Sequence, residues 1–397
     1  SGNVNNARSS WTTLIAMFIN QIDNPAPLSG SDLKTTVTKR NFQSQVRWRR
    51  PSDLKRSLPE NVRELGLPYH LWKSVGSAIE EVLAEVERWT EKHAQLFDGD
   101  AKPTMKERAP RYEHLRTYYY CLTWRSMKYE INDLATVKQI IKRELHNWPQ
   151  MKFQFACAYA MQNLIRDDFM FDRHYRATFK TRLAYHPVYD FWLTLLDTRN
   201  EENLFIMENQ APNQRVMLCF RFAVTHGFIE LTRYFWDKIS VGQREYMGML
   251  QWRALCFRTR SRETLRFLSL ELFNLNPIYL ARLTWTVFYD SLYKCLTGTD
   301  SEKIIEERKI RFLLESISRN LKIQLLKMER YKAVIDAYYY KDDHMFAYLL
   351  EHIPDSQVRI VRERVDRIID RKKSVESTLH RALIRRQVTI DGAGLRG

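Results

Sequence analysis

The feature that most limits how this chain can fold is a helical phrase that occurs twice in residues 218–272. The first copy covers residues 223–236, and a shift of about 33 residues places it on residues 256–269. Acidic, basic and large apolar positions coincide between the copies: Glu230 with Glu263, Arg233 with Arg266, and Tyr234 with Phe267. A pattern that returns at a fixed period indicates units that bury their apolar faces on one another. We therefore expect repeated pairs of helices.

The order of residue types in this phrase resembles the second half of an ankyrin repeat. That family places small residues before a short turn with Gly, then an acidic residue, two apolar residues, a basic residue and an apolar run, with a period of about 33 residues. Related phrases stand at 133–141 and 337–350. The family's T-P-L-H opening and its glycine-rich hairpin do not occur, so a HEAT-like α–α solenoid fits the remainder of the chain as well. The resemblance implies an all-α solenoid of helix-turn-helix repeats with a capping helix at each end and a concave surface for a partner.

Composition also favours helices. Gly and Pro number only 12 each among 397 residues, about half of their average usage, so few tight turns are present to join strands. Hydrophobic residues make up 44% and aromatic residues 13% of the chain, which excludes a largely disordered protein. Helix is therefore expected to dominate.

Four regions are predicted along the chain: an N-terminal helix and basic linker at 1–56, a long helix and connection that cap the repeats at 57–110, the repeat domain at 111–354, and a charged helix with a flexible tail at 355–397. Apolar spacing and breakers predict individual helices over 69–96, 112–124, 133–141, 153–165 and 188–196, and a loop over 199–213.

The expected environment is reducing and aqueous. No apolar run approaches the roughly 18–20 residues that span a bilayer, and residues 1–30 lack the layout of a signal peptide. The five cysteines are scattered, without a C-x-x-C motif, which is typical of reduced thiols in a core. We expect an intracellular protein, cytoplasmic or nuclear, without a transmembrane segment.

Positive charge is concentrated in two segments. The formal net charge is +16, and between Lys34 and Arg56 eight Lys or Arg residues oppose only Asp53. From position 355 to 397, eleven Lys or Arg residues oppose six acids. Residues that could contact phosphates or bases of a nucleic acid are Arg47, Trp48, Arg49, Arg50, Arg371, Lys372 and Lys373. The first segment is equally compatible with a nuclear import signal or a solvated basic loop.

Aromatic residues supply the candidate contacts to a protein partner, because aromatic side chains carry much of the energy of interfaces. The candidates are Tyr118, Tyr119, Tyr338, Tyr339, Trp236 and Trp252. The runs 118–120 and 338–340 would also suit stacking on single-stranded RNA. Three consecutive residues of a helix point in three directions, so each run is expected to contribute at least one buried and one exposed ring.

No catalytic pattern stands out. Asp167, Asp168, Asp172 and His174 could ligate a divalent cation, but interleaved arginines favour a salt-bridged segment. Asp342, Asp343 and His344 occupy a turn of the repeat phrase, where Asp caps a helix. P-loop, G-x-G-x-x-G, H-E-x-x-H and G-x-S-x-G motifs do not occur. The expected function is a non-enzymatic protein–protein interaction scaffold or adaptor without metal or cofactor, and the alternative is an RNA- or DNA-binding module.

Overall fold

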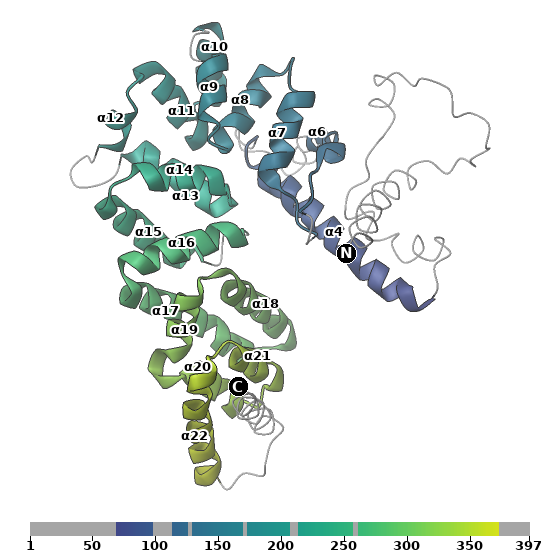
Figure 1. The fold of residues 1–397 in the computed structure, drawn as a ribbon, viewed down its shortest axis with the longest axis vertical. Coiled ribbons are helices and arrows are strands. Elements are labelled where there is room, and N and C mark those ends of the chain that lie inside the picture. The colour runs from purple at the N-terminus through teal and green to yellow at the C-terminus, as the bar shows by residue number, and fades with distance from the viewer. Residues whose placement is uncertain are drawn as a thin grey trace, which may run out of the picture. The chain divides into compact units, whose positions relative to one another are not determined.

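A computed structural model describes residues 69–97, 113–125, 129–169, 173–206, 213–256 and 261–372 (Figure 1). Within these ranges the chain is all-helical, as expected, and the only β-type pairing is an isolated antiparallel bridge between Trp124 and Ile131. The chain divides into two compact units, unit 1 up to His186 and unit 2 from Pro187 onward. This division falls inside the segment 111–354 that the sequence predicts as one repeat domain. Among the described residues, no helix combines the length and the apolar character needed to cross a lipid bilayer.

Unit 1 begins with a long helix, α4, and continues through short ones. Its elements are α4 (Tyr69–Ala94), α6 (Glu113–Arg116), a 3-10 turn (Tyr119–Cys121), α7 (Asp133–Arg143), α8 (Pro149–Ala158), α9 (Gln162–Phe169) and α10 (Arg173–Leu183). The helix predicted over 69–96 is confirmed as α4, whose apolar face buries Val82, Val86 and Trp89. Phe153 of α8 packs on Phe169 of α9 and on Phe179 of α10, which joins the last three helices.

Two of the predicted helices in unit 1 are wrong. Residues 112–124 do not form one aromatic helix: the chain leaves α6 after four residues and runs extended beside the segment before α7. The backbone N–H of Thr123 donates to the hydroxyl of Thr136 at 2.9 Å, and that of Asn132 donates to the carbonyl of Thr123 at 2.7 Å. These tertiary hydrogen bonds replace those of a helix. Residues 153–165 form α8 and α9 instead of one helix, because Ala160 adopts a left-handed conformation with φ 47° between them.

Unit 2 is a series of longer helices. Its elements are α11 (Pro187–Thr198), α12 (Glu201–Phe205), α13 (Gln214–His226), α14 (Ile229–Lys238), α15 (Val241–Leu255), α16 (Arg262–Leu275), α17 (Pro277–Thr297), α18 (Asp300–Ser316), α19 (Arg319–Lys327), a 3-10 turn (Met328–Arg330), α20 (Lys332–Tyr339), α21 (Asp343–Glu351) and α22 (Asp355–Lys372). The region predicted as a loop over 199–213 contains α12, which Asn200 caps by accepting the N–H of Asn203 at 3.2 Å.

The helices of unit 2 pack as successive pairs (Figure 1). Helix α13 contacts its partner α14 and also α15, and α14 contacts α16, so like helices of neighbouring pairs lie together. The next pair repeats this arrangement, since α15 contacts α17 and α16 contacts α18. The second helices of the first two pairs begin at Ile229 and at Arg262, 33 positions apart. These two helix starts fall at the same position within the two copies of the sequence phrase, 223–236 and 256–269.

Local chemistry explains where these helices end. Gly227 terminates α13 with φ 77°, and the N–H of Phe228 donates to the carbonyl of Ala223 at 2.8 Å. A Cβ at Gly227 would lie 2.4 Å from the Cβ of Ser261, so both the backbone conformation and the close approach of the next pair require glycine. The predicted capping role of Asp342 is confirmed, because its carboxylate accepts the N–H of Met345 at 2.9 Å.

The five cysteines behave as predicted. All are free and buried, at positions 121, 157, 219, 256 and 295. Burial raises the pKa of Cys121 and of Cys295 to about 11 and that of Cys219 well above its usual range. These thiols are therefore protonated near neutral pH and fill the core as small apolar groups.

Candidate partner-binding site

The predicted tryptophan contacts lie in the core of unit 2. Trp252 is fully buried and its indole N–H donates to the hydroxyl of Thr284 at 2.9 Å. Trp236 exposes only 2% of its surface, and its indole N–H donates to Glu271 at 3.0 Å. Each indole thus links one helix pair to the next. Neither ring offers a surface to a partner in this conformation.

Tyr118 and Tyr119 are also engaged within unit 1. The hydroxyl of Tyr118 donates to the Sδ atom of Met151 at 3.2 Å, and burial raises the pKa of this tyrosine to about 12. The hydroxyl of Tyr119 lies 2.8 Å from that of Thr90 on α4, and its ring stands edge-on to Trp89. Tyr120 is the exposed ring of this run. The expected mixture of buried and exposed rings is confirmed.

The second tyrosine run contributes to an exposed aromatic cluster. Tyr338 is buried against Phe346, whereas Tyr339 exposes 49% of its surface. Tyr340 lies 5.4 Å from Tyr339 and 6.3 Å from Tyr293 of α17, measured between ring centroids. Of the six predicted aromatic contacts, Tyr339 is the one that the structure leaves clearly exposed. Its exposed neighbours Tyr293 and Tyr340 were not among the predicted contacts.

The predicted basic contacts lie almost entirely beyond the described residues. Arg47, Trp48, Arg49, Arg50 and Lys373 are outside the described ranges, and Arg371 and Lys372 are the last two residues of α22. They therefore remain a prediction of the sequence.

Unit 2 carries a groove of about 770 Å³ that none of the predicted residues lines. It lies between α16, the end of α18 with the first half of α19, and the junction of α21 with α22. The lining side chains come from these three places: Arg266 and Leu270; Glu315, Ile317, Ser318, Arg319, Lys322 and Ile323; and Glu351, His352, Ile353, Pro354 and Asp355. Leu270, one of these lining residues, exposes 44% of its surface. The groove combines apolar side chains with charged groups at its edges.

Hydrogen bonds fix the wall of this groove. Ser318 caps α19, and its backbone N–H donates to the buried hydroxyl of Ser269 on α16 at 2.8 Å. The guanidinium of Arg266 donates to the carbonyl of Glu315 at 3.3 Å, while the carboxylate of Glu315 pairs with Arg262 at 3.0 Å. The groove is therefore held by contacts between helix pairs that are distant in sequence.

The groove also contains cations that are not paired with acidic side chains of the described residues. Burial lowers the pKa of Lys322, the charge of Glu315 raises it, and the charge of Arg266 lowers it further, with a net decrease. No described acidic side chain forms an ion pair with Lys322, Arg266 or Arg319. An anionic group of a ligand would therefore interact favourably with Lys322 in this half-buried position.

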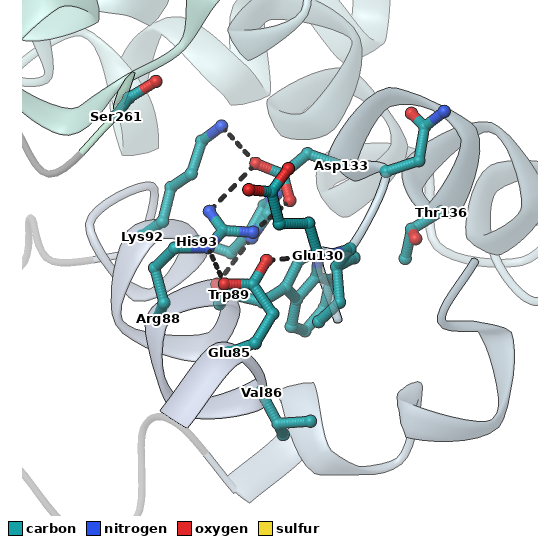
Figure 2. Close-up of polar contacts among 12 residues, drawn as sticks. Glu85, Val86, Arg88, Trp89, Lys92, His93, Glu130, Asp133, Thr136 and Ser261 are labelled. Carbon is teal, nitrogen blue, oxygen red and sulfur yellow. Dashed lines mark hydrogen bonds and ion pairs between the residues drawn. The ribbon is translucent and has the colours of Figure 1, made fainter. Parts of the chain in front are cut away.

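Unit 1 contains a buried charge network at the junction of α4 and α7. Figure 2 shows the side chains of Arg88 and Lys92 reaching from α4 toward Asp133 at the start of α7. Arg88 donates to the two carboxylate oxygens of Asp133 at 2.6 and 3.1 Å, and Lys92 donates at 2.6 Å. Glu85 accepts from Arg88 and from the backbone N–H of Ile131, each at 2.8 Å. The network joins α4 to α7. The hydrogen bond from Ile131 to Glu85 also holds the extended segment before α7 against α4.

The surroundings of Asp133 and His93 determine whether these two side chains are charged. Burial alone would raise the pKa of Asp133, but the charges of Lys92 and Arg88 and the hydrogen bonds from Arg88 outweigh it and hold this pKa well below its usual range. Burial lowers the pKa of His93 to about 3. The Nδ1 atom of His93 donates to the carbonyl of Trp89 at 2.7 Å, so Nε2 accepts the hydroxyl of Tyr159 at 2.7 Å. At neutral pH an ionised Asp133 and a neutral His93 therefore coexist in one network.

The acidic clusters noted in the sequence are not brought together as ligands. Asp168 pairs with Lys152 of α8, and Asp172 lies outside the described residues. Asp342 is engaged as a helix cap. Within the described part of the chain, no group of three or more Asp, Glu, His or Cys side chains is placed to hold a metal ion.

Comparison of the chain with models of known protein families, with curated proteins and with solved structures gives no match.

Proposed function

We propose that this protein is a non-enzymatic interaction scaffold, in which unit 2 is an α-solenoid of ankyrin-like helix pairs. The stacking of α13 and α14 on α15 and α16, with second helices that begin 33 positions apart, supports the repeat interpretation. The period and the turn glycine agree with an ankyrin-like unit. A repeat scaffold presents one surface built from consecutive pairs, which suits a long partner segment.

The groove of unit 2 is the observation that carries this proposal. Its apolar side chains, Leu270, Ile323 and Pro354, would receive apolar side chains of a partner. Arg266, Arg319 and Lys322 at its edges would pair with carboxylates on the same segment. We therefore propose that the groove binds an extended or helical segment of a partner protein that combines apolar and acidic residues.

The test is an affinity purification of the intact chain from its native extract, with and without nuclease, read by mass spectrometry. The altered chain carries Leu270→Asp and Ile323→Asp, which place negative charge among the apolar side chains of the groove. The matched control is Ile278→Asp on α17, a residue with 68% exposure outside the groove.

A partner that survives nuclease treatment, is retained by the control and is lost from the groove variant supports the proposal. The loss supports the proposal when the helices around the groove show the same hydrogen exchange in the groove variant as in the parent chain. Equal recovery of every protein by the groove variant and the control would contradict it.

A further inference from the structure

The corner between α7 and α8 in unit 1 presents cations that have no ion-pair partner. Lys138, Lys142 and Arg143, termed the α7 cations below, are all exposed, and no described acidic side chain pairs with them. Lys138 and Lys142 are four residues apart, so they lie on one face of the helix about 6 Å apart along its axis. The acid of this helix, Asp133, is already occupied by Arg88 and Lys92. The outer face of α7 is therefore positively charged.

Trp148 stands beside these cations at the start of α8. It is the most exposed aromatic side chain among the described residues, with 62% of its surface accessible. Its backbone N–H donates to the carbonyl of Leu145 at 3.3 Å, and Pro149 begins the helix directly after it. The backbone at this position is fixed, while the indole has no described hydrogen-bond partner. An exposed indole on a fixed backbone is suited to stacking on a flat ligand.

The surroundings of Trp148 favour a nucleic acid over a protein or a membrane. In the described part of unit 1 the other exposed large apolar side chains are Tyr120, Tyr129 and Tyr185, and Trp148 forms no ring contact with a described aromatic side chain. A protein hot spot needs a surrounding ring of contacts that excludes water, and membrane insertion needs a larger apolar area. An isolated aromatic ring among cations instead matches single-stranded nucleic acid, where bases stack on aromatic rings and phosphates contact Lys and Arg.

Helix α10 adds to the positive field of the same unit. Residues 173–186 contain Arg173, Arg176, Lys180 and Arg182 but no Asp or Glu. Arg173, Lys180 and Arg182 are exposed. The stacked rings of Phe153 and Phe179, 5.0 Å between centroids, fix α10 to α8. A basic surface attracts polyanions over distances of about one Debye length, roughly 8–10 Å at physiological salt.

We propose that the α7–α8 corner binds single-stranded nucleic acid. Trp148 stacks on one base, and the α7 cations contact neighbouring phosphates. This role goes beyond the scaffold function, since it concerns unit 1 and a different class of partner. It also places the contact at residues other than the basic segments that the sequence predicted.

The test measures binding of the full chain to a fluorescein-labelled oligouridine of about 15 nucleotides by fluorescence anisotropy, at several salt concentrations between about 50 and 200 mM. Trp148→Ala is expected to weaken binding about 5- to 150-fold without changing the salt dependence, because stacking on an aromatic ring is not an ionic contact. Trp148→Phe retains a ring and is expected to restore most of the affinity.

A second variant replaces the three α7 cations by Ala. It is expected to weaken binding and to reduce the slope of log K against log salt by up to about 2, since each phosphate contact to a single strand contributes about 0.7. The matched control replaces Lys294, Lys309 and Arg311 of unit 2 by Ala. This control removes the same amount of positive charge. Each of the three residues is paired with an acid three or four positions away on the same helix. The control chain should therefore bind the oligonucleotide as tightly as the parent chain does.

Any affinity that the predicted basic segments contribute is common to all variants, so the differences between variants carry the result. Photocross-linking of a 4-thiouridine oligonucleotide should label the peptide that contains Trp148. Unchanged affinity and salt dependence in both α7–α8 variants would overturn the proposal. So would preferential binding, dependent on Trp148, to polyglutamate or to phosphatidylserine vesicles, which would assign the corner to an acidic protein or to a membrane surface.

Discussion

The two units use ion pairs in different ways. In unit 1 Arg88 and Lys92 pair with Asp133, more than 40 positions along the chain, and Lys92 exposes only 7% of its side chain. In unit 2 most pairs join residues three or four apart on one exposed helix, as Lys309 with Glu306 and Arg311 with Glu307 do. The first kind of pair determines which helices meet. The second kind lies on the exposed surface of helices that pack on one another through apolar contacts.

The difference follows from the kind of contact that holds the helices together in each unit. In unit 2 successive helices pack on one another through apolar side chains, and the buried rings of Trp236 and Trp252 connect α14 to α16 and α15 to α17. Helix α4 of unit 1 has no equivalent neighbour. A directional network of charges therefore fixes its contact with α7, at a considerable desolvation cost.

The largest expected effect comes from breaking the network of unit 1. Asp133→Ala leaves the half-buried Arg88 and the buried Lys92 without their carboxylate and should lower the free energy of unfolding by about 3–5 kcal/mol. Hydrogen exchange, read separately in peptides of α4, α7 and unit 2, should show the loss in unit 1. Replacing the whole network, with Asp133→Leu, Arg88→Met and Lys92→Met together, should recover much of it. A loss below about 1 kcal/mol for Asp133→Ala would mean that unit 1 does not depend on this pairing.

The turn between α13 and α14 of unit 2 should be sensitive for a reason that involves no charge. Gly227→Ala is expected to cost about 1–3 kcal/mol, because it forces a side chain into a left-handed conformation and against Ser261. The matched control is Gly242→Ala in the first turn of α15, where no atom lies within 4 Å of the added Cβ. Urea denaturation should separate the two variants. Equal stability would show that the close approach of neighbouring pairs is not required.

Acidification should weaken unit 1 before unit 2. His93 is neutral in the fold with a pKa of about 3, whereas an unfolded histidine titrates near 6.5. The unfolded chain therefore takes up a proton that the folded chain does not, and stability present above about pH 6.5 is lost as the pH falls toward 3. The loss is about 1.4 kcal/mol per pH unit, or roughly 2 kcal/mol at pH 5.

Urea denaturation between pH 7.5 and 5, with hydrogen exchange to assign the unit, checks this expectation. His93→Phe should be less stable at pH 7.5, because it leaves the hydroxyl of Tyr159 without its acceptor, but its stability should depend less on pH. A variant with an unchanged pH dependence would assign the acid sensitivity to another group.

The smallest expected effect comes from the exposed pairs of unit 2. Glu307→Gln removes the carboxylate that Arg311 contacts at 2.7 Å and should cost about 0.5 kcal/mol or less, with a further decrease of the effect at high salt. Arg311 keeps its contact with the ring of Tyr348, at 4.1 Å from the centroid. A loss comparable to that of Asp133→Ala would remove the distinction between the two units.

Sequence periodicity predicted several helices of this protein, namely α4, α7 and α11. The spacing of apolar residues predicted α4, the repeated phrase coincides with the starts of α14 and α16, and the scattered cysteines indicated buried thiols. These features are local or depend on a short period, and for that reason a single sequence contains them. The helix predicted over 112–124 failed because Thr136 and Asn132 supply hydrogen bonds from outside that segment. Composition could not reveal such partners.

The candidate sites depended on burial, which the sequence did not determine. Trp236, Trp252 and Trp148 are the same residue type, yet the first two bury their rings between helix pairs while Trp148 remains exposed at a helix start. One signal was present in the sequence: the cations around Trp148 and the absence of acids in 173–186. The sequence by itself determined the all-helical character of the described residues and the positions of several helices. Only tertiary packing decided which aromatic rings and charges remain available to a partner, because exposure depends on neighbours that are distant along the chain.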